Sequence, residues 1–200
     1  MFRTTKEMRE FYNCPASGRY ESFQKSEGWN IPALLIENIL PLLRGGERMI
    51  DVGCGPGLVG EELEKSGWQG LLIGLDVAEN RLHEARRHSV YGACVHADAY
   101  HLPFRNCCFD IVLSSAMVGL TGIRSIREMR RIVGPGGYLA CVIAELKDIP
   151  VCRERFEKAL LFLKKMSDAE LIICKDLGSG YSFSNYGGEH FVLFVHRIVL

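Results

Sequence analysis

Apolar positions along the chain alternate from residue 33 onward between a helical spacing and short strand-like runs. Helices are predicted where apolar residues recur every three or four positions, and strands where compact apolar runs are bounded by turn residues. The predicted helices cover 33–43, 58–65, 79–88, 123–133 and 153–166. The predicted strands cover 48–52, 71–75, 92–96, 109–114, 138–144, 171–176 and 191–199. We expect one or two short helices within the mixed polar and aromatic residues 1–32.

Regular alternation of strands and helices predicts an α/β fold, with a mostly parallel sheet covered by helices on both faces. The last two predicted strands, 171–176 and 191–199, have no helix between them. They are therefore expected to pair antiparallel, because a parallel pair needs a long crossover connection. We expect a single domain over residues 1–200, with residues 1–32 as an N-terminal helical segment.

Composition narrows the classes of protein that remain. Lys plus Arg and Asp plus Glu both number 24, which argues against a generic electrostatic nucleic-acid binder. No apolar run is long enough to span a membrane, and the first residues contain no apolar signal core, so we expect a cytoplasmic protein. Eight scattered cysteines without a C-x-x-C pair favour reduced thiols and predict no metal site.

The glycine-rich turn after the first strand carries the most chemical information. Gly55-x-Gly57-x-x-Gly60 fits a dinucleotide fingerprint, with Asp76 near the position of a ribose-binding acid. The overlapping string Asp51-Val-Gly-x-Gly-x-Gly instead places a carboxylate directly before the glycines. Such a charge repels a pyrophosphate and attracts an ammonium group. A ligand with a cationic end near the first strand and a ribose near the second satisfies both observations.

Five motifs in order make the chain resemble the class I S-adenosylmethionine-dependent methyltransferases. They are the glycine turn, Leu75-Asp76-Val77, His96-Ala97-Asp98-Ala99, Phe109-Asp110-Ile111-Val112-Leu113-Ser114-Ser115, and the helix that ends in Gly134-Pro135-Gly136-Gly137. The resemblance implies a Rossmann-like seven-stranded sheet whose last strand is antiparallel and inserted between strands five and six. A narrower resemblance, to methyltransferase-like proteins of the Williams–Beuren region type, rests on Phe11-Tyr12, Tyr20, Gly57 to Leu63 and Val90-Tyr91-Gly92.

The resemblance also implies which residues contact the cofactor. The glycine turn lies against the methionine part, an acid after strand two holds the ribose, and an acid after strand three binds the adenine amino group. Arg81 stands where a methionine often packs on adenine. Tyr12 and Tyr20 are expected to close the pocket as an N-terminal lid. The full set is Tyr12, Tyr20, Asp51, Gly53, Cys54, Gly55, Gly57, Asp76, Val77, Arg81, Asp98, Ala99 and Ser114. Asp110, at the start of a strand, is expected to be structural.

The implied activity is transfer of a methyl group from S-adenosylmethionine to an acceptor, leaving S-adenosylhomocysteine. We expect a small-molecule acceptor, because the fold uses most of the chain. Residues 115–121 after the fourth strand and Glu145 after the fifth are expected to face the acceptor cavity. The segment Ala116-Met117-Val118 supplies no histidine, and the catalytic candidates are His101, Tyr186, Glu189 and His190. Two alternatives remain: a non-catalytic cofactor-binding partner or sensor subunit, and an oxidoreductase that uses a nicotinamide dinucleotide. Without coiled-coil heptads, a monomer is the default expectation.

Overall fold

A computed structural model describes residues 4–13, 30–146, 150–179 and 189–199. One seven-stranded sheet runs through the molecule in the order β3-β2-β1-β4-β5-β7-β6. Its strands are β1 Arg48–Val52, β2 Leu71–Asp76, β3 Tyr91–His96, β4 Phe109–Ser115, β5 Val133–Leu146, β6 Ala169–Ser179 and β7 Glu189–Ile198. β7 lies between β5 and β6 and is antiparallel to both, whereas the other paired strands are parallel. This confirms the predicted Rossmann-like sheet and the inserted last strand.

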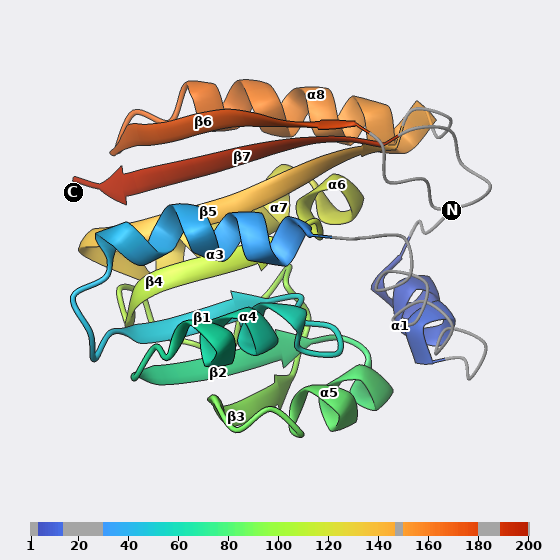
Figure 1. The fold of residues 1–200 in the computed structure, drawn as a ribbon. Coiled ribbons are helices and arrows are strands. Elements are labelled where there is room, and N and C mark those ends of the chain that lie inside the picture. The colour runs from blue at the N-terminus through green and yellow to red at the C-terminus, as the bar shows by residue number, and fades with distance from the viewer. Residues whose placement is uncertain (1–3, 14–29, 147–149, 180–188, 200) are drawn as a thin grey trace.

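Helices cover both faces of the sheet, as Figure 1 shows. α3, α4 and α5 pack on one face, and α6, α7 and α8 pack on the other. α1 lies beyond the end of the sheet toward which β1, β2 and β3 point (Figure 1). The helices are α1 Thr5–Asn13, α3 Ile31–Ile39, a 3₁₀ turn η2 Leu40–Leu42, α4 Leu58–Ser66, α5 Glu79–Ala85, α6 Val118–Thr121, α7 Ile123–Ile132 and α8 Pro150–Lys164.

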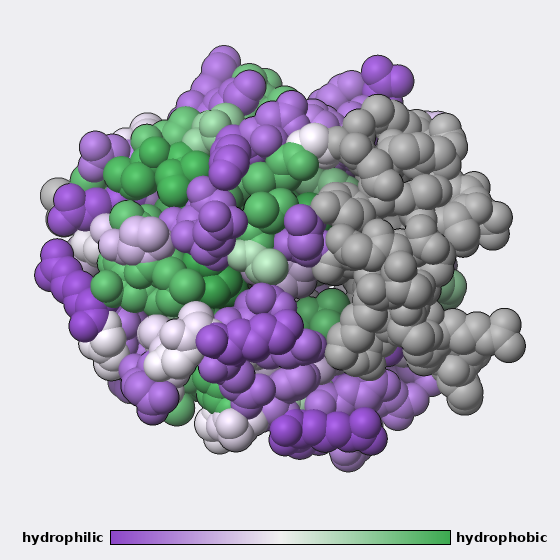
Figure 2. Space-filling view, viewed as in Figure 1, coloured by the Kyte–Doolittle hydropathy of each residue, from purple (hydrophilic) through white to green (hydrophobic). Residues whose placement is uncertain are grey.

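The core consists of two layers separated by the sheet. Along β1, Met49 packs into the layer under α3 and α4, and its neighbour Ile50 packs into the opposite layer. Successive strand residues point to opposite faces, so a strand buried on both sides must be apolar throughout. Figure 2 shows the outer surface on the α3 side, where apolar patches flank the helix among polar side chains.

Several element boundaries differ from the predicted ones for local physical reasons. The helix expected over 33–43 becomes 3₁₀ after Ile39, where Pro41 lacks the N–H that would continue the α-helical ladder. The helix expected over 79–88 ends at Ala85, and the N–H groups of Arg87 and His88 bond three residues back, which tightens the chain. β5 absorbs the predicted Gly134–Gly137 break through a register shift against β4.

Asp110, the second residue of β4, joins the starts of two neighbouring strands. The backbone N–H of Arg48 and its Nε donate to Oδ2 of Asp110, at 2.9 and 3.0 Å, and Nη2 donates to Oδ1 at 2.8 Å. This fork ties β1 to β4 at the end of the sheet opposite the glycine turn, in agreement with a structural role. Among the described residues, no helix is long and apolar enough to cross a membrane, and all the cysteines are free.

Candidate functional site

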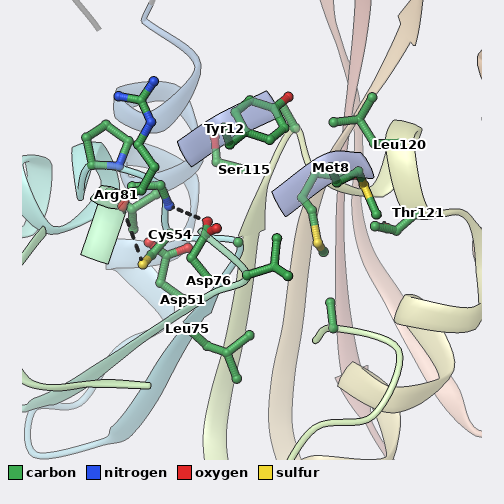
Figure 3. A pocket seen from close by; sticks show the side chains of 18 of the residues that line it. Met8, Tyr12, Asp51, Cys54, Leu75, Asp76, Arg81, Ser115, Leu120 and Thr121 are labelled. Carbon is green, nitrogen blue, oxygen red and sulfur yellow. Dashed lines mark hydrogen bonds between the residues drawn. The ribbon is translucent and has the colours of Figure 1, made fainter. Parts of the chain in front are cut away.

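A pocket lies at the carboxyl ends of β1, β2 and β4, where an open α/β sheet is expected to bind its ligand. α1 covers it from outside through Thr5, Met8 and Tyr12. Figure 3 shows two different sides: Asp51, Cys54 and Asp76 lie together on one, and Met8, Leu120 and Thr121 lie on the other. The pocket is therefore acidic on one side and largely apolar on the other.

Many residues that the sequence predicted for the cofactor line this one pocket. They are Tyr12, Asp51, Gly53, Cys54, Gly55, Asp76, Val77, Arg81, Asp98 and Ala99. They come from α1, from the last residues of β1 and β2, from the turns that follow β1, β2 and β3, and from α5. Tyr20 lies outside the described residues.

The glycine turn is held against the end of β2. The backbone N–H groups of Gly53 and Cys54 both donate to the carbonyl of Leu75, at 2.7 and 3.0 Å. The N–H of Gly55 donates to Oδ2 of Asp76 at 2.9 Å. Gly53 has a φ of 77°, and a Cβ on it would lie 2.9 Å from the side chain of Met117. Only glycine fits this position, because the backbone is left-handed here and the side chain of Met117 leaves no room for a Cβ.

Asp51 is fully buried at the end of β1. Its Oδ2 accepts a 2.9 Å hydrogen bond from the hydroxyl of Tyr91, and its Oδ1 has no hydrogen-bond partner among the described residues. Burial raises the pKa of Asp51 from its usual value of 3.8 to about 7, the Tyr91 hydrogen bond opposes that rise, and the charge of Asp76 adds to it. An acceptor oxygen is thus left available for a donor, ideally a cationic one.

Asp76 and Asp98 are oriented by backbone donors. Asp76 accepts from Gly55 and from the N–H of Ala78 at 2.8 Å, and burial raises its pKa in spite of these bonds. Asp98 accepts from the N–H of Tyr100 through Oδ1 and from the hydroxyl of Thr5 through Oδ2, each at 2.8 Å. These hydrogen bonds hold both carboxylates at the pocket, where hydroxyl or amino groups of a ligand can donate to their remaining lone pairs.

Two of the predicted cofactor residues do not line the pocket. Gly57 begins α4 with a φ of 97°, and a Cβ there would lie 2.8 Å from His88 and 3.1 Å from Tyr91. A glycine is needed at position 57 because His88 and Tyr91 pack directly against its backbone. Ser114 is fully buried and donates to the carbonyl of Val52 at 2.9 Å, whereas its neighbour Ser115 lines the pocket. The strand alternation accounts for that one-residue difference.

Two of the four catalytic candidates, His101 and His190, are not among the residues that line the described pocket. His101 is paired with Arg124, 2.6 Å away. His190 lies between two carboxylates, with Nε2 2.9 Å from Asp176 and Nδ1 3.7 Å from Glu145. Glu189 is the first residue of β7, opposite Leu146, and Tyr186 lies outside the described residues. The described pocket lining contains no histidine, lysine or glutamate.

Some pocket residues were not predicted from the sequence. These are Thr5 and Met8 of α1, whereas Met117, Leu120 and Thr121 come from the segment 115–121 after β4, which was expected to face the cavity. α1 gives a usable signal, because its apolar residues Met8, Phe11 and Tyr12 recur at helical spacing. α6 has only four residues, too few for a periodic pattern.

Comparisons with known proteins agree with this geometry. Residues 50–141 match the family model described as "Methyltransferase domain". An uncharacterized methyltransferase of Schizosaccharomyces pombe is 30% identical over 159 residues, covering 73% of this chain and 57% of that protein. A demethylmenaquinone methyltransferase of Staphylococcus saprophyticus is 28% identical over 163 residues, covering 74% of this chain and 66% of that protein. The chain thus spans between about half and two thirds of the length of these curated relatives.

Solved structures of methyltransferases have a similar fold. Magnesium protoporphyrin IX methyltransferase from Synechocystis, solved with bound S-adenosylmethionine, aligns with a TM-score of 0.74 at 11% identity, covering 99% of this chain and 98% of that one. S-adenosylmethionine is the cofactor that these comparisons support. The matched domain over residues 50–141, the fold and the named relatives are thus similar to those of S-adenosylmethionine-dependent methyltransferases.

Proposed function

We propose that the protein transfers a methyl group from S-adenosylmethionine to a small-molecule acceptor. One observation carries the proposal: Asp51, Asp76 and Asp98 stand at or just after the carboxyl ends of three neighbouring strands, and all three residues line one pocket. The residues present fit the cofactor, because the buried Oδ1 of Asp51 lacks a partner among the described residues and suits a cationic group.

Each part of the cofactor has residues suited to hold it. Asp51 would accept from the ammonium group, Asp76 from the ribose hydroxyls and Asp98 from the adenine amino group. The turn over Gly53 and Gly55 would let the backbone approach the methionine part. When bound, S-adenosylmethionine supplies a methyl group on a sulfur that is already activated for displacement.

The chain's own contribution would then be placement and exclusion of water. Holding two reacting groups at near-attack distance can supply about 7–11 kcal/mol of the barrier reduction. Met8 and Tyr12 of α1 cover the pocket and would keep water from the reacting groups. We propose residues 1–32 as a lid on this basis.

The apolar side of the pocket suggests the kind of acceptor. Met8, Met117 and Leu120 would contact an apolar body. One relative is named for demethylmenaquinone, and one solved structure of similar fold is named for magnesium protoporphyrin IX. The described lining offers no histidine, lysine or glutamate, and its three aspartates are assigned to the cofactor, so we propose an acceptor atom that needs no protein base. A carbon or oxygen nucleophile that is ionised near neutral pH satisfies this condition.

Cofactor binding can be tested by thermal melting with S-adenosylmethionine, S-adenosylhomocysteine and a nicotinamide dinucleotide. A ligand at 100 times its Kd adds about 2.7 kcal/mol, which for this size raises the Tm by roughly 5–10 °C. We expect a shift with the adenosyl ligands alone, lost in Asp76→Ala and kept in Asp110→Asn. A shift with the dinucleotide alone would reject the proposal.

A second candidate is a methyltransferase-like partner subunit that binds the cofactor without chemistry of its own. The described pocket lining favours it in one respect, since it contains no histidine, lysine or glutamate and its three aspartates are assigned to the cofactor. Radiolabelled S-adenosylmethionine incubated with a small-molecule extract separates the two candidates. Label transferred to any acceptor by the wild-type protein, but not by Asp76→Ala, removes the non-catalytic one.

The finer expectations remain proposals of the same kind. We retain the narrower resemblance to methyltransferase-like proteins of the Williams–Beuren region type, a cytoplasmic location and a monomeric state. Tyr12, one of the residues behind the narrower resemblance, lines the pocket.

A further inference from the structure

The ring of Tyr91 lies in a slot made by three glycines beneath the pocket. Tyr91 is the first residue of β3 and is 9% exposed. A Cβ on Gly57 or Gly74 would lie 3.1 or 3.0 Å from its ring, and a Cβ on Gly60 would overlap it. Gly57 and Gly60, the last two glycines of the dinucleotide-like string, therefore make room for this ring.

Packing alone does not explain a tyrosine in this slot. A phenylalanine would fill it equally well and would bury no hydroxyl, and a buried hydroxyl is costly unless it is bonded. The hydroxyl of Tyr91 donates to Oδ2 of Asp51 at 2.9 Å. Asp51 lines the pocket from 40 residues away in the chain, and its Oδ1 has no partner among the described residues.

We propose that Tyr91 is a positioning residue, which acts through Asp51 to hold that carboxylate charged and oriented for the ammonium group of the ligand. The identity of the ligand rests on the proposed function. The hydrogen bond fixes Oδ2 and leaves Oδ1 to accept from the ligand. A hydrogen bond to the charged form also favours that form over the neutral acid.

Several titratable groups surround Asp51. The charge of Asp76 on β2 raises the pKa of Asp51. The charge of Asp51 in turn raises the pKa of Cys54 in the glycine turn and of Cys94 on β3. Arg81 from α5 acts on Asp76. Tyr91 is the group that hydrogen-bonds to Asp51 and lowers its pKa. Replacing that hydroxyl with hydrogen should raise the pKa of Asp51 and so reduce its charged fraction near pH 7.

Two ligands separate positioning from packing. S-adenosylhomocysteine carries the ammonium group, whereas 5′-methylthioadenosine has the same nucleoside and sulfur but no amino-acid part. We expect Tyr91→Phe to weaken S-adenosylhomocysteine about 10-fold or more at pH 7, as for loss of a hydrogen bond to a charged group. The loss should shrink as the pH rises toward 9, because Asp51 then ionises without help. Binding of 5′-methylthioadenosine should not change.

Calorimetric titration between pH 6 and pH 9 measures these affinities. Asp51→Asn should reproduce the loss for S-adenosylhomocysteine, and Tyr91→Phe should add nothing in that background. An equal loss for both ligands, or a loss that does not vary with pH, would overturn the proposal and leave Tyr91 a packing residue.

A second measurement needs no ligand. Carbon NMR can follow the Asp51 carboxyl in free wild-type and Tyr91→Phe protein, and the midpoint should move to higher pH in the variant. An unchanged midpoint would refute the proposal even if the binding titrations of Tyr91→Phe could not be completed. If neither ligand binds the wild-type protein, the proposed function fails, while this titration still decides the role of Tyr91.

Discussion

The hydroxyl of Thr5 donates a 2.8 Å hydrogen bond to Oδ2 of Asp98, joining α1 to the turn after β3 across 93 positions of the chain. At the other end of α1, Asn13 and Asn80 are joined by two hydrogen bonds, at 3.1 and 2.8 Å. Met8 lies between these anchors and is 7% exposed. α1 is therefore attached over the pocket at both of its ends.

Thr5→Val should loosen this attachment without changing the size of the side chain. Loss of one hydrogen bond to a carboxylate is worth about 1.5–3 kcal/mol, of which water recovers part. We expect S-adenosylhomocysteine to dissociate several-fold faster, measured by stopped-flow fluorescence. Lys6→Ala, at an exposed position of the same helix, is the control and should leave the rate unchanged. Equal rates for Thr5→Val and wild type would mean that α1 does not retain the ligand.

Asp51→Asn should stabilise the ligand-free protein, and more strongly at high pH. The folded-state pKa of Asp51 is about 7, above the usual 3.8, so the native state binds the extra proton between these values. The stability of the wild-type protein therefore falls as pH rises through this window. Asn has no proton to lose. Between pH 5 and pH 7 the wild-type protein loses about 3 kcal/mol of folding stability that Asp51→Asn does not lose. The stability difference in favour of Asp51→Asn should therefore be about 3 kcal/mol larger at pH 8 than at pH 5.

Thermal melting of wild type and Asp51→Asn at both pH values measures this difference. Asp110→Asn is the matched control, because the pKa of Asp110 is lowered by its hydrogen bonds to Arg48 rather than raised by burial. That variant should lose a little stability at both pH values. If Asp51→Asn melted below wild type at pH 8, the buried charge would not be the destabilising element that we infer.

Gly60→Ala should destabilise the protein, although alanine is the better helix former. In an exposed helix interior the change would gain roughly 0.8–1 kcal/mol. Here the added Cβ would overlap the ring of Tyr91, and overpacking of this kind costs about 1–3 kcal/mol. Urea denaturation should show the net loss, with a part recovered when Gly60→Ala is combined with Tyr91→Leu. Additive losses in the double variant would show that the ring is not what excludes the methyl group.

Deleting residues 191–200 should prevent folding, because it removes most of β7 from between β5 and β6. Both neighbouring strands would lose their ladders, and Phe191 and Phe194, which are fully buried, would be lost from the two core layers. Circular dichroism and melting would show no cooperative transition. Deleting residues 199 and 200 alone should have little effect, since Val199 is 51% exposed.

The strands and most helices followed from local patterns. β1, β2 and β4 are apolar runs bounded by turn residues, and such runs need no knowledge of their partners. The errors were also local in origin. The helix over 79–88 was extended too far because its polar residues suit a helix, whereas the chain tightens after Ala85 to bring Tyr91 onto β3. α6 is too short for any period to be visible.

The sequence by itself determined the order of elements and the acids at the ends of β1, β2 and β3, because both follow from short-range spacing along the chain. The tertiary structure decided which side chains meet: Tyr91 with Asp51, Thr5 with Asp98, and Gly57 and Gly60 with a ring instead of a ligand. Partners 40 and 93 positions apart leave no periodic signal. The contact exists only once the sheet and its covering helices bring distant segments within bonding distance.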